Sequence, residues 1–269
     1  MKTINTIGDL QNLRQFADEN NQKIGLIPTM GALHEGHLEL VRQAQKHSDI
    51  ALPYIFLNPT QFAPEEDLDA YPKTLEADTQ QLKEIGVEYL WLPQMQDVYP
   101  NGLQTDIHIE GLTKYLEGEH RPHFFDGVTS VVKRMFDLSK PDKVFLGEKD
   151  FQQLQVIRQL VLEYKMDIEI IGVPTIRDKN GLALSSRNAY LNDSEYEIAA
   201  ELNNVLVKFA QNMITEKEAI LLLRDIGFDK VDYCTAVNSE TFLPDNPSRV
   251  LAAAWIGRTR LIDNMPICP

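Results

Sequence analysis

Two histidines at the start of an amphipathic segment have a spacing suited to phosphate chemistry. His34 and His37 lie three residues apart in the stretch 28–38, which joins an apolar run, residues 24–27, to a segment with helical spacing of apolar residues. This places the pair on a turn between a strand and a helix. The first turn of a helix leaves backbone N–H groups unpaired and carries partial positive charge, so it favours anions. The stretch therefore predicts a phosphate site with two imidazole donors.

Two glycines accompany these histidines. Gly31 and Gly36 would let a ligand approach the backbone closely, because glycine has no Cβ. The pattern His-x-Gly-His is short, and the alternative is that one histidine caps the helix while the other faces solvent. Evidence from the rest of the chain is needed to choose between these two interpretations.

A second strand-to-helix turn is organised in the same way. Residues 147–153 follow the apolar run 143–146 and contain a glycine, a charged turn and the start of a helix. Lys149 can act as a point charge on a phosphate. The alternative is a capping box, in which Asp150 and Gln153 satisfy the first N–H groups of the helix without any ligand. Gln153 could cap the helix and still face a cleft.

Two further segments carry polar groups suited to substrate binding. In residues 184–188, two hydroxyls and a guanidinium occur without an adjacent acidic residue, which predicts an anion site, with an ordinary solvated loop as the alternative. Asn58 and Gln61 are neutral amides that follow the apolar run 50–57. They could hold a carboxylate or a hydroxyl, and the alternative is a plain Asx turn into Pro59.

The remaining histidines and the cysteines indicate no metal site. His108, His120 and His123 lack metal-like spacing, and we expect them at the surface or in loops. Cys234 and Cys268 lack such spacing too, and they do not form a disulfide framework. Reduced cysteines fit a cytoplasmic protein.

The composition excludes several classes of function. The chain has 269 residues and 43% hydrophobic content, enough for a core in one or two domains. Its net charge of -14 and pI near 4.9 argue against binding nucleic acid or an anionic membrane, which would need clustered Lys and Arg. The N-terminus lacks the apolar core of a signal peptide, and no run approaches the roughly 18 apolar residues of a membrane span.

Apolar spacing predicts the elements that position these groups. A helix opens the chain with Thr6 or Asp9 as its cap, and strands then alternate with helices up to residue 173, interrupted by an irregular segment at 97–125. The expected strands are residues 23–27, 50–57, 87–92, 143–146 and 168–173, and apolar residues mark helices near 38–47, 75–85, 127–136 and 154–161. This alternation predicts a Rossmann-like, doubly wound and mainly parallel α/β sheet.

The pattern changes in the C-terminal third of the chain. Two helices are expected there, the first with a capping box of Asn192 and Glu195 and the second starting near Thr215, followed by two or three strands. We therefore expect two domains, residues 1–175 and residues 176–269, of which the second is smaller and α+β.

Six segments together resemble the pantothenate synthetase family, the pantoate–β-alanine ligases of the nucleotidylyltransferase superfamily. They occur in order along nearly the whole chain, and six in register are far more specific than one short pattern. The segments are residues 28–37, 58–62, 71–78, 147–153, 184–188 and 259–264. The resemblance implies that ATP first transfers AMP to the carboxylate of pantoate. The amine of β-alanine then attacks this pantoyl adenylate, giving pantothenate, AMP and pyrophosphate.

The resemblance also implies roles for individual residues. The expected catalytic residues are His37, as hydrogen-bond or proton donor at the transferring phosphate, with His34, Lys149 and Arg187. The expected ATP-binding residues are Met30, Gly31, Ala32, Leu33, His34, Glu35, Gly36, His37, Gly147, Glu148, Lys149, Asp150, Ile176, Leu184, Ser185, Ser186 and Arg187. The expected substrate-binding residues are Gln61, Gln153 and Asn58, with Gln61 also near β-alanine.

Further expectations concern the metal, the assembly and domain motion. Mg²⁺ is expected on the phosphates of ATP, with Asp78 as a candidate protein ligand. The family implies a homodimer. The domain at 1–175 would bind ATP and pantoate, and the domain at 176–269 would close as a lid that carries Ser185, Ser186 and Arg187.

Two positions depart from the commonest pattern of the family. Ala63 replaces a frequent glycine, and residues 124–126, Phe-Phe-Asp, stand where a basic residue is often found. Two other functions also stay open: a nucleotidyltransferase that releases an adenylylated product, and a non-catalytic ATP-binding module.

Overall fold

The computed structural model of this chain describes residues 1–62 and 68–267. The chain divides into two compact units. The first comprises Met1–Glu148 and Gln152–Val173, and the second comprises Lys149–Phe151 and Pro174–Pro269. Lys149, Asp150 and Phe151 therefore group with the second unit, although the chain on either side of these three residues belongs to the first.

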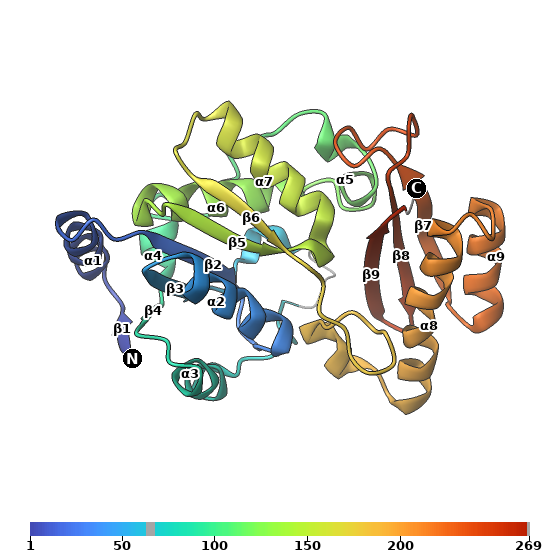
Figure 1. Cartoon of the computed structure of the whole chain (residues 1–269), viewed down its shortest axis with the longest axis horizontal. Coiled ribbons are helices and arrows are strands. Elements are labelled where there is room, and N and C mark those ends of the chain that lie inside the picture. The colour runs from blue at the N-terminus through green and yellow to red at the C-terminus, as the bar shows by residue number, and fades with distance from the viewer. Residues whose placement is uncertain (63–67, 268–269) are drawn as a thin grey trace. The chain divides into compact units, whose positions relative to one another are not determined.

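A parallel sheet of six strands forms the centre of the first unit (Figure 1). Its strands are β1 Lys2–Ile4, β2 Ile24–Thr29, β3 Ile50–Ile55, β4 Tyr89–Trp91, β5 Lys143–Gly147 and β6 Glu169–Val173. Their order is β1-β4-β3-β2-β5-β6, and every pair is parallel. From β2 the chain progresses outward through β3 to β4, beyond which β1 forms the edge, and from β5 it progresses in the other direction to β6. This confirms the predicted doubly wound sheet, whose order reverses between β2 and β5.

Helices alternate with these strands. They are α1 Ile7–Glu19, α2 Glu35–His47, α3 Leu75–Glu84, α4 Met95–Val98, α5 Glu117–His120, α6 Phe124–Ser139 and α7 Phe151–Glu163. Short 3-10 turns occur at η1 Pro59–Gln61, η2 Leu112–Lys114, η3 Glu148–Asp150 and η4 Ser186–Tyr190. Thr6 caps α1 by accepting from the N–H of Asp9, so the first of the two predicted caps is the correct one.

The burial of β2 and β3 explains why residues 24–27 and 50–57 form continuous apolar runs in the sequence. Ile24, Leu26 and Leu52 are almost fully buried in these neighbouring strands, and Leu38 and Val41 of α2 belong to a core cluster that includes Ile27 of β2. Strands covered on both faces need apolar residues at successive positions, because neither face meets water. The apolar runs of β2 and β3 are thus explained by helices that cover both faces of the sheet.

The structure differs from the sequence-based expectation in three places. β1 was not predicted, because three residues are too short to show a period, yet Lys2–Ile4 pairs with β4. α6 begins at Phe124, three residues before the predicted start at Gly127. Leu75, one of the apolar residues that marked the helix near 75–85, is exposed at the start of α3.

The second unit contains an antiparallel sheet with two helices. Its strands are β7 Lys230–Val237, β8 Arg249–Ile256 and β9 Thr259–Pro266, in the order β7-β8-β9, and its helices are α8 Asp193–Ala210 and α9 Glu216–Ile226. The predicted capping box of Asn192 and Glu195 is confirmed, and Thr215 caps α9 in the same way. The predicted α+β character of this part of the chain is also confirmed. Its core joins α8 to the alanines of β8.

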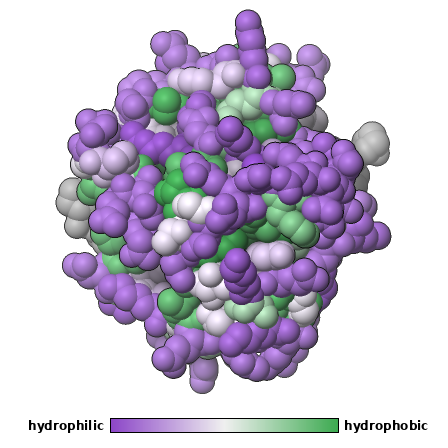
Figure 2. Space-filling view, turned by 90° about the vertical axis from the view of Figure 1, so that its left-hand side faces the viewer, coloured by the Kyte–Doolittle hydropathy of each residue, from purple (hydrophilic) through white to green (hydrophobic). Residues whose placement is uncertain are grey.

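One face of the molecule shows how polar and apolar residues are distributed on the surface. The face shown in Figure 2 is mostly hydrophilic, with hydrophobic residues in smaller areas between polar ones. None of the helices in the described part of the chain combines the length and the apolar character needed to span a membrane.

Candidate active site

The two histidines lie at the head of α2 and take part in its cap. His34 is the N-cap residue, and its Nδ1 accepts a hydrogen bond from the backbone N–H of Gly36 at 3.1 Å. Nδ1 of His37 accepts from the backbone N–H of His34 at 3.4 Å. The capping interpretation therefore applies to both side chains rather than to one. Both rings are half-buried, so neither simply faces solvent.

Capping sets the tautomer of both rings. A nitrogen that accepts a hydrogen bond carries no proton, so a neutral imidazole bonded in this way is protonated at Nε2. The hydrogen bonds of the cap thus turn each Nε2–H into the donor end of its side chain. The capping and phosphate-binding interpretations are compatible, because they use different nitrogens of the same rings.

Asp78 fixes the turn that leads into α2. Its carboxylate, 1% exposed, accepts from the backbone N–H groups of Ala32 at 3.0 Å and Leu33 at 2.8 Å. Thr74 Oγ1 donates to it as well. Gly31 has a φ of 86°, and a Cβ there would lie 3.2 Å from Oδ2 of Asp78. The expectation that Asp78 binds magnesium is corrected accordingly: its oxygens are occupied by the turn.

The side chain of Gln61 meets the same turn. Its Nε2 donates to Sδ of Met30 at 2.7 Å, and its Oε1 accepts from Nδ2 of Asn58 at 3.2 Å. Asn58 is 2% exposed, and its Oδ1 accepts from the N–H of Thr60, which confirms the Asx turn. Asn58 thus orients Gln61 from a buried position, and its expected contact with a substrate stays a prediction.

Three residues that the sequence analysis missed complete this cluster. The hydroxyl of Tyr99 donates to Oδ1 of Asn58 at 2.6 Å, and burial raises the pKa of this phenol, so it stays protonated. Arg121 donates to the backbone oxygen of Gln61 at 3.2 Å. A Cβ on Gly127 would lie 2.2 Å from the backbone oxygen of Thr60, so only glycine fits there.

The structure shows the contacts of one of the two departures from the family pattern. Asp126 of the Phe-Phe-Asp segment pairs with Nδ1 of His108 at 2.9 Å. The guanidinium of Arg121 lies over the ring of Phe124, 3.8 Å from its centroid, and donates to the backbone oxygen of Gln61. Ala63, the other departure, lies outside the described residues.

The glycine turn after β5 lies at the same edge of the sheet as the histidine turn. β5 pairs directly with β2, and both strands are parallel, so Gly147 and Met30 follow neighbouring carboxyl ends. Open α/β sheets bind ligands at this edge, where the strand order reverses. A Cβ on Gly147 would meet no atom within 4 Å. The space beside it is therefore open to a ligand.

The turn before α7 is a 3-10 turn. η3, Glu148–Asp150, runs without a break into α7, so Asp150, the cap in the alternative interpretation, belongs to η3. Gln152 is the buried glutamine of this turn, and its amide donates to the backbone oxygens of Leu112 and Tyr115. Gln153 is half-buried on the next position of the helix.

The remaining predicted ATP-binding residues lie in the second unit. The backbone N–H of Leu184 donates to the oxygen of Ile176 at 2.9 Å, and Ser185 Oγ accepts from the N–H of Arg187 at 3.3 Å. Lys149 belongs to the same unit. The structure thus groups Met30–His37 with Gln61 in one unit, and Lys149 with the 184–187 segment in the other.

A family model settles what kind of protein this is. The model described as pantoate-beta-alanine ligase matches residues 2–266 of the chain. The chain belongs to the pantoate–β-alanine ligase family. The predicted resemblance is confirmed, and membership makes the chain a C–N ligase.

Relatives of this ligase match along its whole length. The pantothenate synthetase of Mesorhizobium japonicum is 43% identical over 276 residues, covering 99% of this chain and 98% of that protein. The crystal structure of pantothenate synthetase from Thermus thermophilus has a TM-score of 0.91 at 37% identity and full coverage of both chains. A pantoate–β-alanine ligase from Francisella tularensis, complexed with beta-gamma ATP and β-alanine, has a TM-score of 0.87 at 35% identity, covering 99% and 97%.

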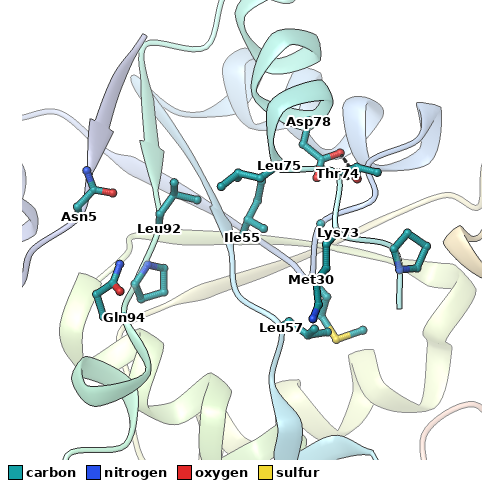
Figure 3. A pocket seen from close by; sticks show the side chains of 13 residues that line it. Asn5, Met30, Ile55, Leu57, Lys73, Thr74, Leu75, Asp78, Leu92 and Gln94 are labelled. Atoms are coloured by element: carbon teal, nitrogen blue, oxygen red, sulfur yellow. Dashed lines mark hydrogen bonds between the residues drawn. The ribbon is translucent and has the colours of Figure 1, made fainter. Parts of the chain in front are cut away.

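The ligase also contains a cavity beside the histidine turn. It measures about 460 Å³ and opens at the carboxyl ends of β1, β3 and β4 (Figure 3). Met30 and Lys73 lie toward one end of it, and Asn5 and Gln94 lie toward the other. Of the predicted site residues, Met30 and Gly31 line this cavity. Met30 thus lines the cavity and also accepts the hydrogen bond of Gln61.

The ligase offers no nucleophilic cysteine or protein metal cluster in its described part. Burial raises the pKa of the Cys234 thiol to about 12, which keeps it protonated at neutral pH. The described residues include no group of three His, Cys, Asp or Glu side chains that could hold a metal ion.

Proposed function

We propose that this chain joins pantoate to β-alanine through a pantoyl adenylate, with the histidine turn as the site of AMP transfer. The observation that carries the proposal is the cap of α2, which directs Nδ1 of His34 and His37 to the backbone and makes Nε2 the donor of each ring. Two such donors at a helix start, at the point where the strand order reverses, suit an α-phosphate.

The first step requires no proton transfer. A carboxylate oxygen of pantoate forms a bond to the α-phosphorus of ATP, and the bond from that phosphorus to the bridging oxygen breaks, releasing pyrophosphate. Negative charge grows on the equatorial oxygens and on the leaving group. We propose that Nε2–H of His37 donates to the α-phosphate and that Lys149 and Arg187 bind phosphate oxygens. Fixed donors of this kind supply most of the acceleration in such reactions.

The second step forms the amide. The neutral amine of β-alanine attacks the acyl carbon, the bond from that carbon to the phosphate oxygen breaks, and AMP leaves with the electron pair. The nitrogen then loses a proton to solvent or to the departing phosphate. We propose that Gln61 holds the pantoate, because Asn58 fixes its Oε1 and so turns its Nε2–H group toward the turn at Met30. Gln153 is proposed as a second contact.

We propose that magnesium reaches the site bound to the phosphates of ATP. Asp78 accepts from backbone N–H groups, and the described residues include no group of three His, Cys, Asp or Glu side chains that could hold a metal ion, so the proposal places the ion on ATP. Bound to the triphosphate, Mg²⁺ would neutralise part of its charge, which this acidic chain does not otherwise offset. No step above depends on a protein ligand to the metal.

A homodimer and a cytoplasmic location are also proposed, on the family resemblance. Light scattering coupled to size-exclusion chromatography measures the first directly, with a mass near twice the 30.7 kDa of one chain as the expected result. A single-chain mass would remove the dimer from the proposal.

A partial-reaction assay tests the proposed function. With ATP and pantoate alone, one enzyme equivalent of pyrophosphate should appear in a burst, while AMP should appear only after β-alanine is added. Continuous release of an adenylylated product without β-alanine would identify a nucleotidyltransferase instead. ATP binding with no pyrophosphate under any condition would identify a nucleotide-binding module.

A further inference from the structure

The backbone of Lys149 is held by a residue from the last strand of the chain. Nδ2 of Asn264, on β9, donates to the backbone oxygen of Lys149 at 2.9 Å. The two residues are 115 positions apart in the sequence. Asn264 is 5% exposed, so this hydrogen bond is shielded from water. Both residues belong to the second unit.

The orientation of this amide is fixed by a buried cation. Oδ1 of Asn264 accepts from Nη1 of Arg249 at 3.2 Å, and a guanidinium can only donate. The oxygen must therefore face Arg249, which leaves the N–H end for Lys149. Arg249 is itself buried, and its guanidinium lies 3.7 Å from the ring centroid of Phe151. One arginine thus fixes both the amide and the residue two positions after Lys149.

Asp263, the residue before Asn264 on β9, holds the loop that leads to the 184–187 segment. Asp263 accepts two hydrogen bonds from Arg177, at 2.6 and 2.8 Å, and its Oδ1 also accepts from the backbone N–H of Asn264 at 2.7 Å. Arg177 in turn donates to the backbone oxygen of Gly181 and pairs with Ala183 in an isolated bridge. The loop it closes leads directly into the 184–187 segment.

We propose that Asn264 is a positioning residue that sets Lys149 and the 184–187 segment at a fixed separation for one bound triphosphate. Through consecutive residues of β9, the turn that carries Lys149 and the loop that leads to Arg187 become parts of one rigid body. A displacement of about 1 Å in such groups can cost on the order of 10²-fold in rate. The inference rests on the proposed phosphate roles of Lys149 and Arg187.

Asn264→Asp removes the N–H donor to the backbone oxygen of Lys149 while changing the shape of the side chain least. The aspartate has the same shape and keeps an oxygen toward Arg249, so the buried cation stays paired, but it offers an oxygen instead of an N–H to the backbone of Lys149. The matched control is Asp232→Asn, at a buried side chain on β7 whose carboxylate accepts from Arg260 and Trp255. It tests whether loss of any buried polar contact in this sheet has the same effect.

The measurement separates the two half-reactions. In single turnover with ATP and pantoate, Asn264→Asp should slow the pyrophosphate burst by about 10- to 100-fold. The consumption of the accumulated adenylate after β-alanine is added should keep its wild-type rate, and Asp232→Asn should keep both rates. A wild-type burst in Asn264→Asp, an equal loss in both half-reactions, or an equal loss in Asp232→Asn would each overturn the inference. Absence of a pantoate-dependent burst in the wild-type chain would instead overturn the proposed function.

Discussion

His34 and His37 place their ring centroids 4.0 Å apart while Nδ1 of each ring accepts a backbone N–H at the start of α2. The same side chains therefore serve the helix cap and the proposed chemistry. This arrangement makes the structural and catalytic contributions of one histidine separable by substitution, because they reside on different nitrogens.

His37→Asn should separate these contributions. Asparagine can place Oδ1 where Nδ1 of the histidine accepts from His34, so the cap is kept, but it has no group in the place of Nε2. We expect the pyrophosphate burst to fall on the order of 10²–10³-fold, with little change in the Kd for ATP. Rapid-quench kinetics and equilibrium binding measure the two quantities.

His37→Gln is the matched control for that variant. Its amide reaches toward the position of Nε2 but cannot cap in the same way, so it should retain more of the burst while losing stability of about 1 kcal/mol. A larger loss of burst rate in the glutamine variant than in the asparagine variant would contradict the assignment.

Lys149→Ala should also slow AMP transfer more than it weakens nucleotide binding. The ammonium group is proposed to meet charge that grows during transfer, whereas other groups hold the nucleotide before it. Single-turnover pyrophosphate release and the Kd for ATP test this together. An unchanged release rate would exclude Lys149 from the reacting phosphates.

Tyr99→Phe should disturb the pantoate site from a distance. The substitution removes the donor to Oδ1 of Asn58, and loss of a buried hydrogen bond costs about 1 kcal/mol. Asn58 then orients Gln61 less firmly, so the KM for pantoate should rise about fivefold, since about 1.4 kcal/mol is a factor of ten. Tyr115→Phe, at an exposed tyrosine, is the control, and an equal rise in KM there would contradict this prediction.

Gly147→Ala should report whether a ligand uses the open space beside β5. A Cβ there meets no protein atom within 4 Å, so the urea midpoint should stay at its wild-type value. The KM for ATP should rise, because the methyl group would occupy space that the phosphates need. Gly127→Ala gives the contrast: its Cβ would press on the backbone of Thr60, and both stability and activity should fall. An unchanged KM for ATP in Gly147→Ala would remove Gly147 from the nucleotide site.

Asp232 should make a measurable contribution to stability in acid. Burial alone would raise its pKa, but hydrogen bonds from Lys230, Arg260 and Trp255 outweigh it and hold the pKa at about 2. Because the folded-state pKa lies below the ordinary value of 3.8, the stabilisation is present above about pH 4 and is lost as the pH falls toward 2. Only 2% of the side chain is exposed, so solvent screens these bonds little. The contribution amounts to about 2 kcal/mol, given about 1.36 kcal/mol for each pKa unit.

The difference in unfolding free energy between the wild-type chain and Asp232→Asn measures that contribution. Urea titrations at several pH values should give a difference that shrinks by about 2 kcal/mol between about pH 5 and pH 2. Asp142, whose pKa is also lowered, is common to both proteins, and its effect cancels. A difference that stays constant with pH would show that Asp232 is not held ionised by its partners.

Local features were determined by the sequence alone. The strand-to-helix turn at His34 and His37, the caps at Asn192 and Thr215 and the alternation of strands with helices all rest on contacts within four residues or on apolar periodicity. Such contacts form wherever the local sequence permits them, so they can be read before the fold is known.

Tertiary structure decided which polar side chains meet. Tyr99 reaches Asn58 across 41 positions, and Asn264 reaches Lys149 across 115. No periodicity encodes these pairs, because they depend on how strands and loops far apart in the chain are brought together by the packed core. The same is true of Asp78. Its acidic side chain suggested a metal ligand, but in the fold its two oxygens accept from the backbone N–H groups of Ala32 and Leu33. A buried polar group bonds the partner that the fold brings to it.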